Sequence, residues 1–336
     1  MQYSEPDLFA GLQRVTEAID PVLFASLDEV KENKSLYESM HYAISTGGKR
    51  LRPSLVFLCA DLFNQPREKF TAVAAAFELL HNFTLIHDDI MDRANMRRGK
   101  ETLYGRYGKE VAGMAGDAMF ASAYRKLEDL QKNFTPKKIL QVTNWFTTAT
   151  FELVKGQVRE LELQKMHEVS LEDYDYVIKN KTASLVVALL KSAVFLAGGK
   201  KKDLKNITVY GESLGQVFQL KDDVLDLTAG EEFGKAIGTD IREGKKTLIA
   251  LHALSKLSKE KASRLRQILE KPSVETTDAE VTEAIKLINE SNSIQFTENH
   301  ALKLLENGRK ALHKFPENRG RDFLELALDY AWKRSK

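Results

Sequence analysis

Apolar residues recur along most of the chain at steps of three and four residues, and no long stretch alternates strictly between apolar and polar residues. Phe77, Leu80 and Phe83 follow this spacing, which continues to Leu85–Ile86 and returns between Leu185 and Ser192. Such spacing places apolar side chains on one face of an amphipathic helix. We therefore predict an all-α chain.

The positions of the seven prolines favour long helices. No proline lies between Pro136 and Pro272, and proline breaks helix interiors. No Gly/Ser-rich or Pro-rich linker divides the chain, so we predict a single domain over residues 1–336. The polar stretch 272–299 is expected to form a peripheral helical hairpin.

Composition narrows the class of protein. Lys and Arg number 50 against 48 Asp and Glu, and this near balance argues against a nucleic-acid binder. Cys59 is the single cysteine, so neither an intramolecular disulfide nor a cysteine-rich zinc site is possible. The most apolar stretch, 183–196, contains Lys191 and is too short to span a bilayer. With no apolar block in the first twenty residues, we expect a cytoplasmic protein without stable membrane anchoring.

One motif occurs twice. Asp-Asp-x-x-Asp stands at 88–92 and again at 222–226, each time after an apolar helical run. Positions i and i+4 share a helix face, so the first and last carboxylates of each motif lie one above the other and repel. A hard divalent cation would compensate, and Mg²⁺ typically takes one or two carboxylates together with substrate phosphates. We predict a Mg²⁺ site at each motif.

The helix faces below the two motifs are mainly small or apolar. By the 100° step of a helix, His81 and Thr84 lie within about 40° of Asp88, with Phe77 on the same side. Near Asp222 the corresponding residues are Gly215, Phe218 and Gln219. Two such faces set opposite each other would form an apolar cavity with metals at its mouth. That arrangement suits a molecule with a charged head and a hydrocarbon tail.

Basic residues accompany the motifs. Gly-Gly-Lys-Arg-Leu-Arg-Pro at 47–53 supplies three cations after a glycine break, and Arg97 and Arg98 follow the first motif. Further candidates are Lys181-Thr182, Lys235 and Lys245. Cations beside a metal site indicate a polyanionic ligand, since arginine and lysine both bind phosphate. Nothing resembles a Walker loop or a dinucleotide glycine fingerprint.

Two other residue patterns give weaker evidence for a function. Glu78-x-x-His81 matches half of a di-iron bundle signature, but a second Glu-x-x-His pair is missing from the sequence. Cys59 lies in an apolar run and is expected to pack in the core rather than act as a nucleophile.

From Gly47 to at least Thr247 the chain resembles the trans-type isoprenyl diphosphate synthases, the polyprenyl synthetase family, and is most similar to the archaeal-type geranylgeranyl diphosphate synthases. The motifs that carry the resemblance, in order, are 47–53, 81–92, 97–99, Gly116-Asp117, Gly156-Gln157, Lys181-Thr182, 218–226 and 234–247. The resemblance implies an all-α isoprenoid synthase fold around a deep apolar cavity, usually as a homodimer. It also implies head-to-tail condensation of isopentenyl diphosphate with an allylic diphosphate. One departure is Glu160, where the family often has aspartate.

The resemblance further implies a role for each matching residue. Asp88 and Asp92 would hold two Mg²⁺ ions and Asp222 a third, about three per site, supported by Asp89, Asp223 and Asp226. The other implied groups are Arg97, Lys181, Thr182, Gln219, Lys235 and Lys245 for the allylic diphosphate, and Lys49, Arg52, His81 and Arg98 for isopentenyl diphosphate. Of these, Lys181 and Lys235 join the three metal-binding aspartates as the expected catalytic residues.

Product length is expected to depend on the residues before the first motif. In the family these residues form the cavity floor, and a lone aromatic at Phe83, five residues before a motif with no insertion, is similar to the archaeal-type C20 enzymes. Thr84 beside it is a further candidate chain-length residue. The helical wheel places Phe83 about 140° from Asp88, however, and favours Phe77 as a deeper stop. We predict geranylgeranyl diphosphate (C20), with farnesyl (C15) or C25 diphosphate as alternatives.

Two other functions fit parts of the pattern. A terpene cyclase shares the fold and the first aspartate motif, but does not need cations at 49, 52 and 98. A non-catalytic subunit of a heteromeric synthase would typically lose one aspartate motif, and both are intact. We therefore expect an active prenyltransferase.

Overall fold

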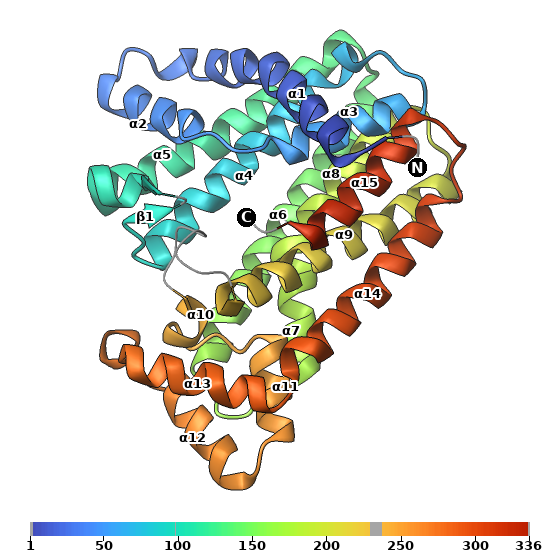
Figure 1. Ribbon diagram of the computed structural model, residues 1–336. Coiled ribbons are helices and arrows are strands. Elements are labelled where there is room, and N and C mark those ends of the chain that lie inside the picture. Colours follow the sequence, from blue (N-terminus) through green and yellow to red (C-terminus); the bar gives the residue numbers. More distant parts are fainter. Residues whose placement is uncertain (1–2, 98, 229–236, 335–336) are drawn as a thin grey trace. The chain divides into compact units, whose positions relative to one another are not determined.

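The computed structural model describes residues 3–97, 99–228 and 237–334 and is built almost entirely of helices (Figure 1). In those ranges the only strands are the short β1 (Met96–Arg97) and β2 (Lys100–Glu101), which pair antiparallel. The all-α prediction is confirmed.

The chain divides into two compact units. Unit 1 comprises Met1–Thr147, Ala188–Thr208 and Leu312–Ala327, and unit 2 comprises Thr148–Val187, Val209–Ala311 and Leu328–Lys336. Every boundary between them falls inside a helix. That the whole chain forms a single domain stays a prediction.

The helical elements are as follows. Those within unit 1 are α1 (Glu5–Ala25), η1 (Asp28–Val30), α2 (Lys34–Ser45), α3 (Leu51–Leu62), η2 (Arg67–Phe70), α4 (Thr71–Met91), α5 (Leu103–Glu128) and η3 (Asp129–Lys132). Those within unit 2 are α7 (Leu171–Val177), η4 (Ile178–Ala183), α10 (Thr239–Arg242), α11 (Leu248–Lys256), α12 (Lys259–Leu269), η6 (Ser273–Glu275) and α13 (Asp278–Glu290). The helices that carry the unit boundaries are α6 (Pro136–Gln164), α8 (Ser184–Leu196), α9 (Lys201–Thr228), α14 (Ser293–Leu312) and α15 (Arg319–Lys333).

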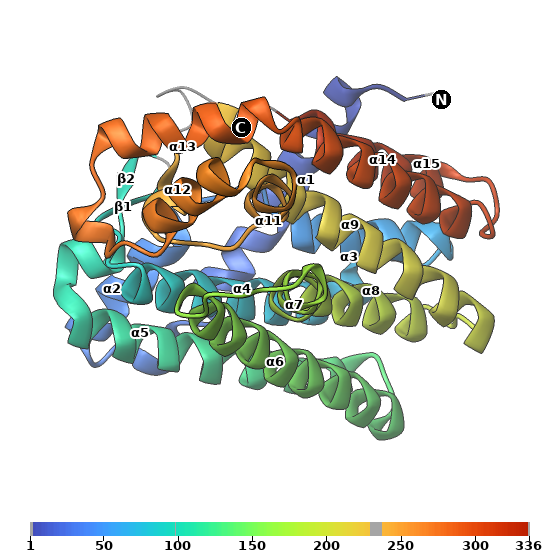
Figure 2. The same ribbon diagram turned by 90° about the horizontal axis from the view of Figure 1, so that it is seen from below.

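Helix α4 is the centre of unit 1. Its apolar positions from Val73 to Leu80 are buried, and the helix lies along α5, as both ribbon views show (Figures 1 and 2). A glycine on α5 permits this approach: a Cβ on Gly116 would stand 2.5 Å from Nε2 of His87. The close packing fixes the end of α4, where the first aspartate motif lies.

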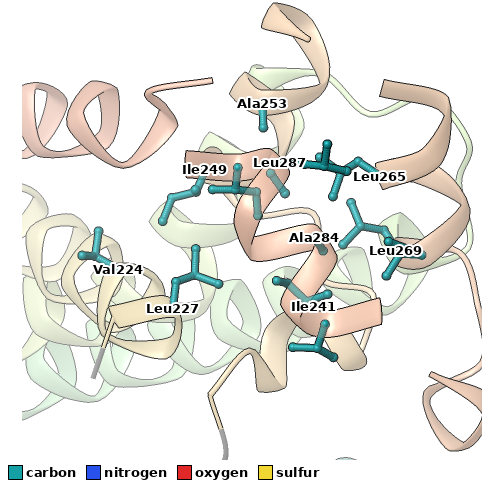
Figure 3. Packing of buried hydrophobic residues seen from close by; sticks show 13 residues of the cluster. Val224, Leu227, Ile241, Ile249, Ala253, Leu265, Leu269, Ala284 and Leu287 are labelled. Carbon is teal, nitrogen blue, oxygen red and sulfur yellow. The ribbon is translucent and has the colours of Figure 1, made fainter. Parts of the chain in front are cut away.

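The core of unit 2 gathers around α13 (Figure 3). At its start the Thr277 hydroxyl accepts from the backbone N–H of Glu280, whose carboxylate accepts from the N–H of Thr277, which is a capping box. The side chains of Ala284 and Leu287 point into a buried cluster with residues of α9, α10, α11 and α12. Residues 272–299 thus contain η6, α13 and the first turns of α14, and one face of α13 is buried in this core.

None of the helices in the described ranges is long and apolar enough to cross a membrane.

Candidate functional site

The first aspartate motif occupies the last turn of α4. The backbone N–H of Asp92 donates to the carbonyl of Asp88 at 2.9 Å, so helical geometry holds through the motif and the two residues stand one turn apart. Asp92 is exposed and Asp88 is half-buried. Two carboxylates are therefore presented on successive turns within reach of solvent, as the i, i+4 spacing predicts.

The middle aspartate of this motif has a different environment. Asp89 is buried and accepts from Nε of Arg97 at 2.7 Å. Burial raises the pKa of the Asp89 carboxyl, and the Arg97 charge opposes that rise. Arg97 belongs to β1, so this contact ties the β1–β2 turn to the end of α4. Its neighbour Arg98 lies outside the described residues.

The chemistry of the first motif suits a hard cation that brings other ligands with it. Over residues 3–97, 99–228 and 237–334, no group of three or more His, Cys, Asp or Glu side chains could hold a metal ion without further donors. Asp88 and Asp92 are thus a pair of oxygen donors and not a closed cage. Mg²⁺ is commonly bound by one or two carboxylates plus phosphate oxygens, and the pair fits that requirement.

The basic segment 47–53 is shaped by an unusual backbone. Gly47 has a φ of 80° and Arg50 a φ of 46°, so the chain turns sharply before α3 begins at Leu51. Lys49 is exposed and Arg52 is half-buried, on either side of a buried Arg50. A left-handed conformation is uncommon for a residue other than glycine and persists where surrounding contacts enforce it.

The contacts of Arg50 supply that enforcement. Its Nε donates to Asp20 of α1 at 2.7 Å, its Nη1 to Glu78 of α4 at 3.1 Å, and its Nη2 to the carbonyl of Ile44 of α2 at 2.9 Å. Glu78 is buried with it. The carboxylate of the half di-iron signature thus serves as the partner of an arginine. His81, one turn further along α4, is half-buried.

Both candidate chain-length aromatics belong to one row of rings in unit 1 that meet edge-to-face or tilted. Phe77 is fully buried, whereas Phe83 is half-buried and packs on α5. The successive ring-centroid distances are Phe77–Phe146 5.2 Å, Phe146–Tyr124 5.0 Å, Tyr124–Phe120 5.1 Å, Phe120–Phe83 4.9 Å and Phe83–His87 4.7 Å. Although a helical wheel separates Phe77 from Phe83, α5 and α6 join them into one aromatic wall. Thr84 bonds back to the carbonyl of His81.

The second aspartate motif lies near the end of α9 in unit 2, and its middle aspartate belongs to a buried network. Asp223 accepts from the hydroxyl of Tyr174 at 2.7 Å and from Nε2 of Gln219 at 3.0 Å. Oε1 of Gln219 accepts in turn from the hydroxyl of Thr182 at 2.9 Å. Thr182 and Gln219, both expected at the allylic diphosphate site, are thus brought together on one hydrogen-bond chain.

The hydrogen bonds of this network do not fully offset the effect of burial on the pKa of Asp223. Burial, and then the charge of nearby Asp240, raise the pKa of the Asp223 carboxyl to about 7, against the two hydrogen bonds that lower it. Burial and the Asp223 charge raise the pKa of Tyr174 well above its ordinary value. Tyr174 therefore stays a hydrogen-bond donor to the aspartate at neutral pH.

The outer aspartates of the second motif have separate partners. Asp222 is half-exposed and its Oδ1 accepts from Nη2 of Arg334 at 2.7 Å. Asp226 is buried and accepts from the backbone N–H of Asp240 at 3.1 Å. The contact to Arg334 uses one carboxylate oxygen of Asp222, which leaves Oδ2 as a donor for a cation. Asp222 is thus the member of this motif best placed to be a metal ligand.

Lys181 stands in the π-helical turn η4 and pairs with Glu160 of α6 at 2.5 Å. Glu160 is the residue at which the sequence departs from the family's usual aspartate. Glycine makes room for the turn: a Cβ on Gly156 would stand 2.4 Å from the backbone nitrogen of Lys181, and one on Gly215 would stand 2.6 Å from Ala183. The Gly156-Gln157 motif therefore lets α6 approach η4.

The ammonium of Lys245 lies 3.1 Å from Asp240 and 2.7 Å from Glu243. It is therefore next to Asp240, the residue whose backbone N–H donates to Asp226. Lys235, the other cation expected in this region, lies outside the described residues.

Unit 1 therefore contains the first motif, the 47–53 segment, His81, Arg97 and the aromatic wall, and unit 2 contains the second motif with Thr182, Gln219 and Lys245. Sequence analysis missed several of the residues that hold these groups in place. They are Asp20, Arg50, Tyr174, Asp240 and Arg334. A positive φ at a buried arginine is visible only in three dimensions, and Tyr174 and Arg334 stand in no recognisable local motif.

Comparisons with known proteins agree with this architecture. A model of the polyprenyl synthetase family matches residues 33–288. The geranylgeranyl diphosphate synthase of Methanosarcina mazei is 33% identical over 310 residues, covering 91% of this chain and 93% of that protein. The crystal structure of geranylgeranyl pyrophosphate synthetase from Pyrococcus horikoshii superposes with a TM-score of 0.90 at 33% identity, covering 98% of this chain and 99% of that one. A polyprenyl synthase from Caulobacter crescentus, solved with calcium and isoprenyl diphosphate, has a TM-score of 0.87 at 29% identity and covers 98% of both chains.

Proposed function

Since the chain belongs to the polyprenyl synthetase family, a family of prenyltransferases, we propose that it condenses isopentenyl diphosphate head-to-tail with allylic diphosphates to give geranylgeranyl diphosphate. The observation that carries the proposal is the pair of Asp-Asp-x-x-Asp helix ends, whose first aspartates, Asp88 and Asp222, both have solvent-accessible carboxylates. The names of the relatives from M. mazei and P. horikoshii support the C20 product.

Each motif has a proposed role in metal binding. Asp88 and Asp92 would hold two Mg²⁺ ions and Asp222 a third, with Asp89, Asp223 and Asp226 in support. Asp89 and Asp223 are buried and already accept hydrogen bonds from Arg97 and Tyr174, respectively. Such contacts suit residues that orient the helix rather than bind the metal directly. When bound, Mg²⁺ supplies positive charge for the leaving diphosphate.

The cations divide between the two substrates. Arg97, Lys181, Lys235 and Lys245 would bind the allylic diphosphate, with Thr182 and Gln219 beside the reacting carbons. Lys49, Arg52, His81 and Arg98 would bind isopentenyl diphosphate. Arg97, Lys181 and Lys245 are each held by a carboxylate, so their positive ends are positioned before any ligand arrives. Preorganised charge of this kind stabilises a transition state without rearrangement during the reaction.

The proposed reaction needs little covalent chemistry from the protein. The allylic C–O bond breaks as the cations neutralise the leaving diphosphate, and the double bond of isopentenyl diphosphate attacks the carbocation. The resulting cation then loses a proton, for which the released diphosphate is the acceptor. The protein's part is to bind, orient and exclude water.

The aromatic wall supports a stop to chain growth. Phe83 and Phe77 are joined through Phe120, Tyr124 and Phe146, and a packed aromatic cluster resists displacement by a growing hydrocarbon tail. Thr84 lies next to Phe83 on α4 and contributes a small side chain there.

We propose that the chain forms a homodimer through an exposed apolar face of α6. Phe151, Val154, Val158 and Leu161 are exposed at spacings of three and four residues. Beside this row, a groove of about 500 Å³ between α6 and α7 is lined by Val154, Val158 and Tyr176 among others. An exposed apolar stripe on one helix is typical of helix–helix interfaces. Val158→Asp should shift the chain to monomer in sedimentation analysis, and Val274→Asp, at an isolated exposed valine, should not.

The test of the proposed function is a product-length assay. Purified protein is incubated with Mg²⁺, labelled isopentenyl diphosphate and, in turn, the C5, C10 and C15 allylic diphosphates, and the dephosphorylated alcohols are chromatographed. We expect a C20 alcohol from every primer. A C15 or C25 alcohol would keep the reaction and contradict the product length. The lack of any condensation product from folded protein would overturn the proposed function in favour of a cyclase or a non-catalytic subunit.

The metal roles are tested by substitution at each motif. Asp88→Ala and Asp222→Ala should each lower turnover by about 100-fold or more, since each removes charge stabilisation at the leaving group. Helical circular dichroism should be unchanged, because both side chains are partly exposed and neither substitution alters the helix backbone. Asp28→Asn, at an exposed surface pair, is the matched control and should keep full turnover. Turnover close to that of the wild type in either alanine variant would reject its metal role.

A further inference from the structure

Arg334, at the end of α15, holds the first aspartate of the second motif. Its Nη2 donates to Oδ1 of Asp222 at 2.7 Å, although the two residues are 112 positions apart in the chain. The Arg334 side chain is only 7% exposed, against 39% for Asp222. A buried, always-charged guanidinium therefore sits behind a carboxylate that faces outward.

Contacts that do not involve Asp222 also keep Arg334 in place. Nη2 bonds to the carbonyl of Phe218 at 3.0 Å, and the guanidinium lies 3.7 Å from the centroid of the Phe218 ring. Two positions before Arg334, the indole of Trp332 makes a cation–π contact with Lys221, whose Nζ lies 5.2 Å from the ring centroid. Since α15 is clamped to α9 at these points, Arg334 would remain beside Asp222 when a ligand arrives.

The charge of Arg334 matters because the second motif is crowded with carboxylates. Asp222, Asp223 and Asp226 share two turns of α9, and Asp240 is close enough to raise the pKa of Asp223. A fixed positive charge relieves their repulsion, and for the same reason it reduces the attraction of Asp222 for a divalent cation. A diphosphate brings several negative charges and restores that attraction.

We propose that Arg334 is a positioning residue and resident counter-ion of the second aspartate motif, which makes divalent-metal binding at Asp222 depend on the presence of a diphosphate. The inference rests on the proposed metal role of Asp222. It deepens that role by explaining how the motif can stay folded and largely metal-free before substrate arrives. It assigns a function to the C-terminal end of α15 that no motif in the sequence indicated.

The test measures metal binding directly, without turnover. In an Asp88→Asn/Asp92→Asn background, which removes the carboxylates of the first motif, Mn²⁺ is titrated and free Mn²⁺ is followed by electron paramagnetic resonance. Each titration is run with and without inorganic pyrophosphate. Arg334→Gln is compared with Lys333→Gln, which removes the same charge from the exposed neighbour that pairs with Asp329.

Removing a fixed positive charge beside Asp222 strengthens the attraction of that carboxylate for a cation, so Arg334→Gln should tighten Mn²⁺ binding without pyrophosphate by at least about tenfold. By linkage, the increase in Mn²⁺ affinity that pyrophosphate causes should be smaller in Arg334→Gln by the same factor. Lys333→Gln should change neither value. Adding Asp222→Asn to Arg334→Gln should remove the gain.

Unchanged or weaker Mn²⁺ binding in Arg334→Gln would overturn the inference, because Arg334 would then be a structural contact only. An equal gain in Lys333→Gln would overturn it too, by showing a general charge effect. If the gain in Mn²⁺ affinity persisted after Asp222→Asn was added to Arg334→Gln, Asp222 would not be the carboxylate on which Arg334 acts. Prenyl transfer by the wild type is assayed separately, so the proposed reaction and the counter-ion role can fail independently.

Discussion

The guanidinium of Arg50 donates to the carboxylate of Glu78 at 3.1 Å, and both side chains are almost completely buried, at 2% and 5% exposure. Arg50 stands between Lys49 and Arg52, and Glu78 stands one helical turn before His81. One buried ion pair therefore fixes the backbone on which three proposed ligands of isopentenyl diphosphate are carried.

Removing Arg50 should lower the free energy of unfolding. Arg50→Met leaves the buried Glu78 charge uncompensated, and breaking a buried pair in this way typically costs about 3–5 kcal/mol. We expect a lower urea midpoint and a raised KM for isopentenyl diphosphate, with the KM for the allylic substrate little changed.

The double variant Arg50→Met/Glu78→Met should recover part of the lost stability, because it removes the unpaired charge as well. Lys31→Gln, which breaks the exposed pair with Asp28, should leave the urea midpoint unchanged. If Arg50→Met were as stable as the wild type, the pair would not be holding this segment.

A methyl group at Gly156 should disturb η4. In Gly156→Ala the new Cβ would stand 2.4 Å from the backbone nitrogen of Lys181, and forced overpacking typically costs about 1–3 kcal/mol. We expect a lower thermal midpoint and a fall in turnover, because Lys181 and Thr182 both belong to the displaced turn. Gly113→Ala, whose Cβ would meet nothing within 4 Å, is the control and should match the wild type or exceed it slightly. Equal behaviour of the two variants would mean that η4 moves aside without cost.

Opening the aromatic wall should lengthen the product. Phe83→Ala removes a half-buried ring that contacts Phe120 and His87, and we expect products beyond C20 in the chromatographic assay. Phe77→Leu tests the deeper position, since Phe77→Ala in the core would cost about 3–5 kcal/mol. Phe63→Ala, which removes a ring packed on Phe315 away from the wall, should keep the C20 product. An unchanged product in both Phe83→Ala and Phe77→Leu would place the stop elsewhere.

The stability of unit 2 should fall at mildly acidic pH. Burial, and then the charge of Lys256, lower the pKa of His252, whose ring stacks on Phe296 at 3.9 Å and bonds to Ser293. A histidine whose pKa is lower in the folded state stabilises the fold above its unfolded pKa, and this stability is lost as pH falls through the folded pKa.

Between pH 7.5 and 5.5 the urea midpoint of the wild type should therefore drop more than that of His252→Gln. His167→Gln, at an exposed histidine, should follow the wild type. A wild-type midpoint that rises on acidification relative to His252→Gln would contradict the assignment.

Much of the site follows from local spacing. Because i and i+4 share a helix face, the sequence alone placed Asp88 over Asp92, and the structure has the 2.9 Å backbone bond that this requires. The same periodicity identified the all-α class. It could not show that Phe77 and Phe83 belong to one aromatic wall, because a helical wheel describes a single helix and the wall needs rings from α5 and α6.

The amino-acid sequence by itself determined which residue types occur and which of them share a helix face, since both are fixed within a few residues of chain. Only the tertiary structure decided the partners that hold them: Glu78 for Arg50, Tyr174 for Asp223, and Arg334 for Asp222. These partners are 28, 49 and 112 residues away, respectively. Local propensity carries no information over such distances, and the pairs form because helix packing brings buried charges together where each must find an opposite charge or a hydrogen bond.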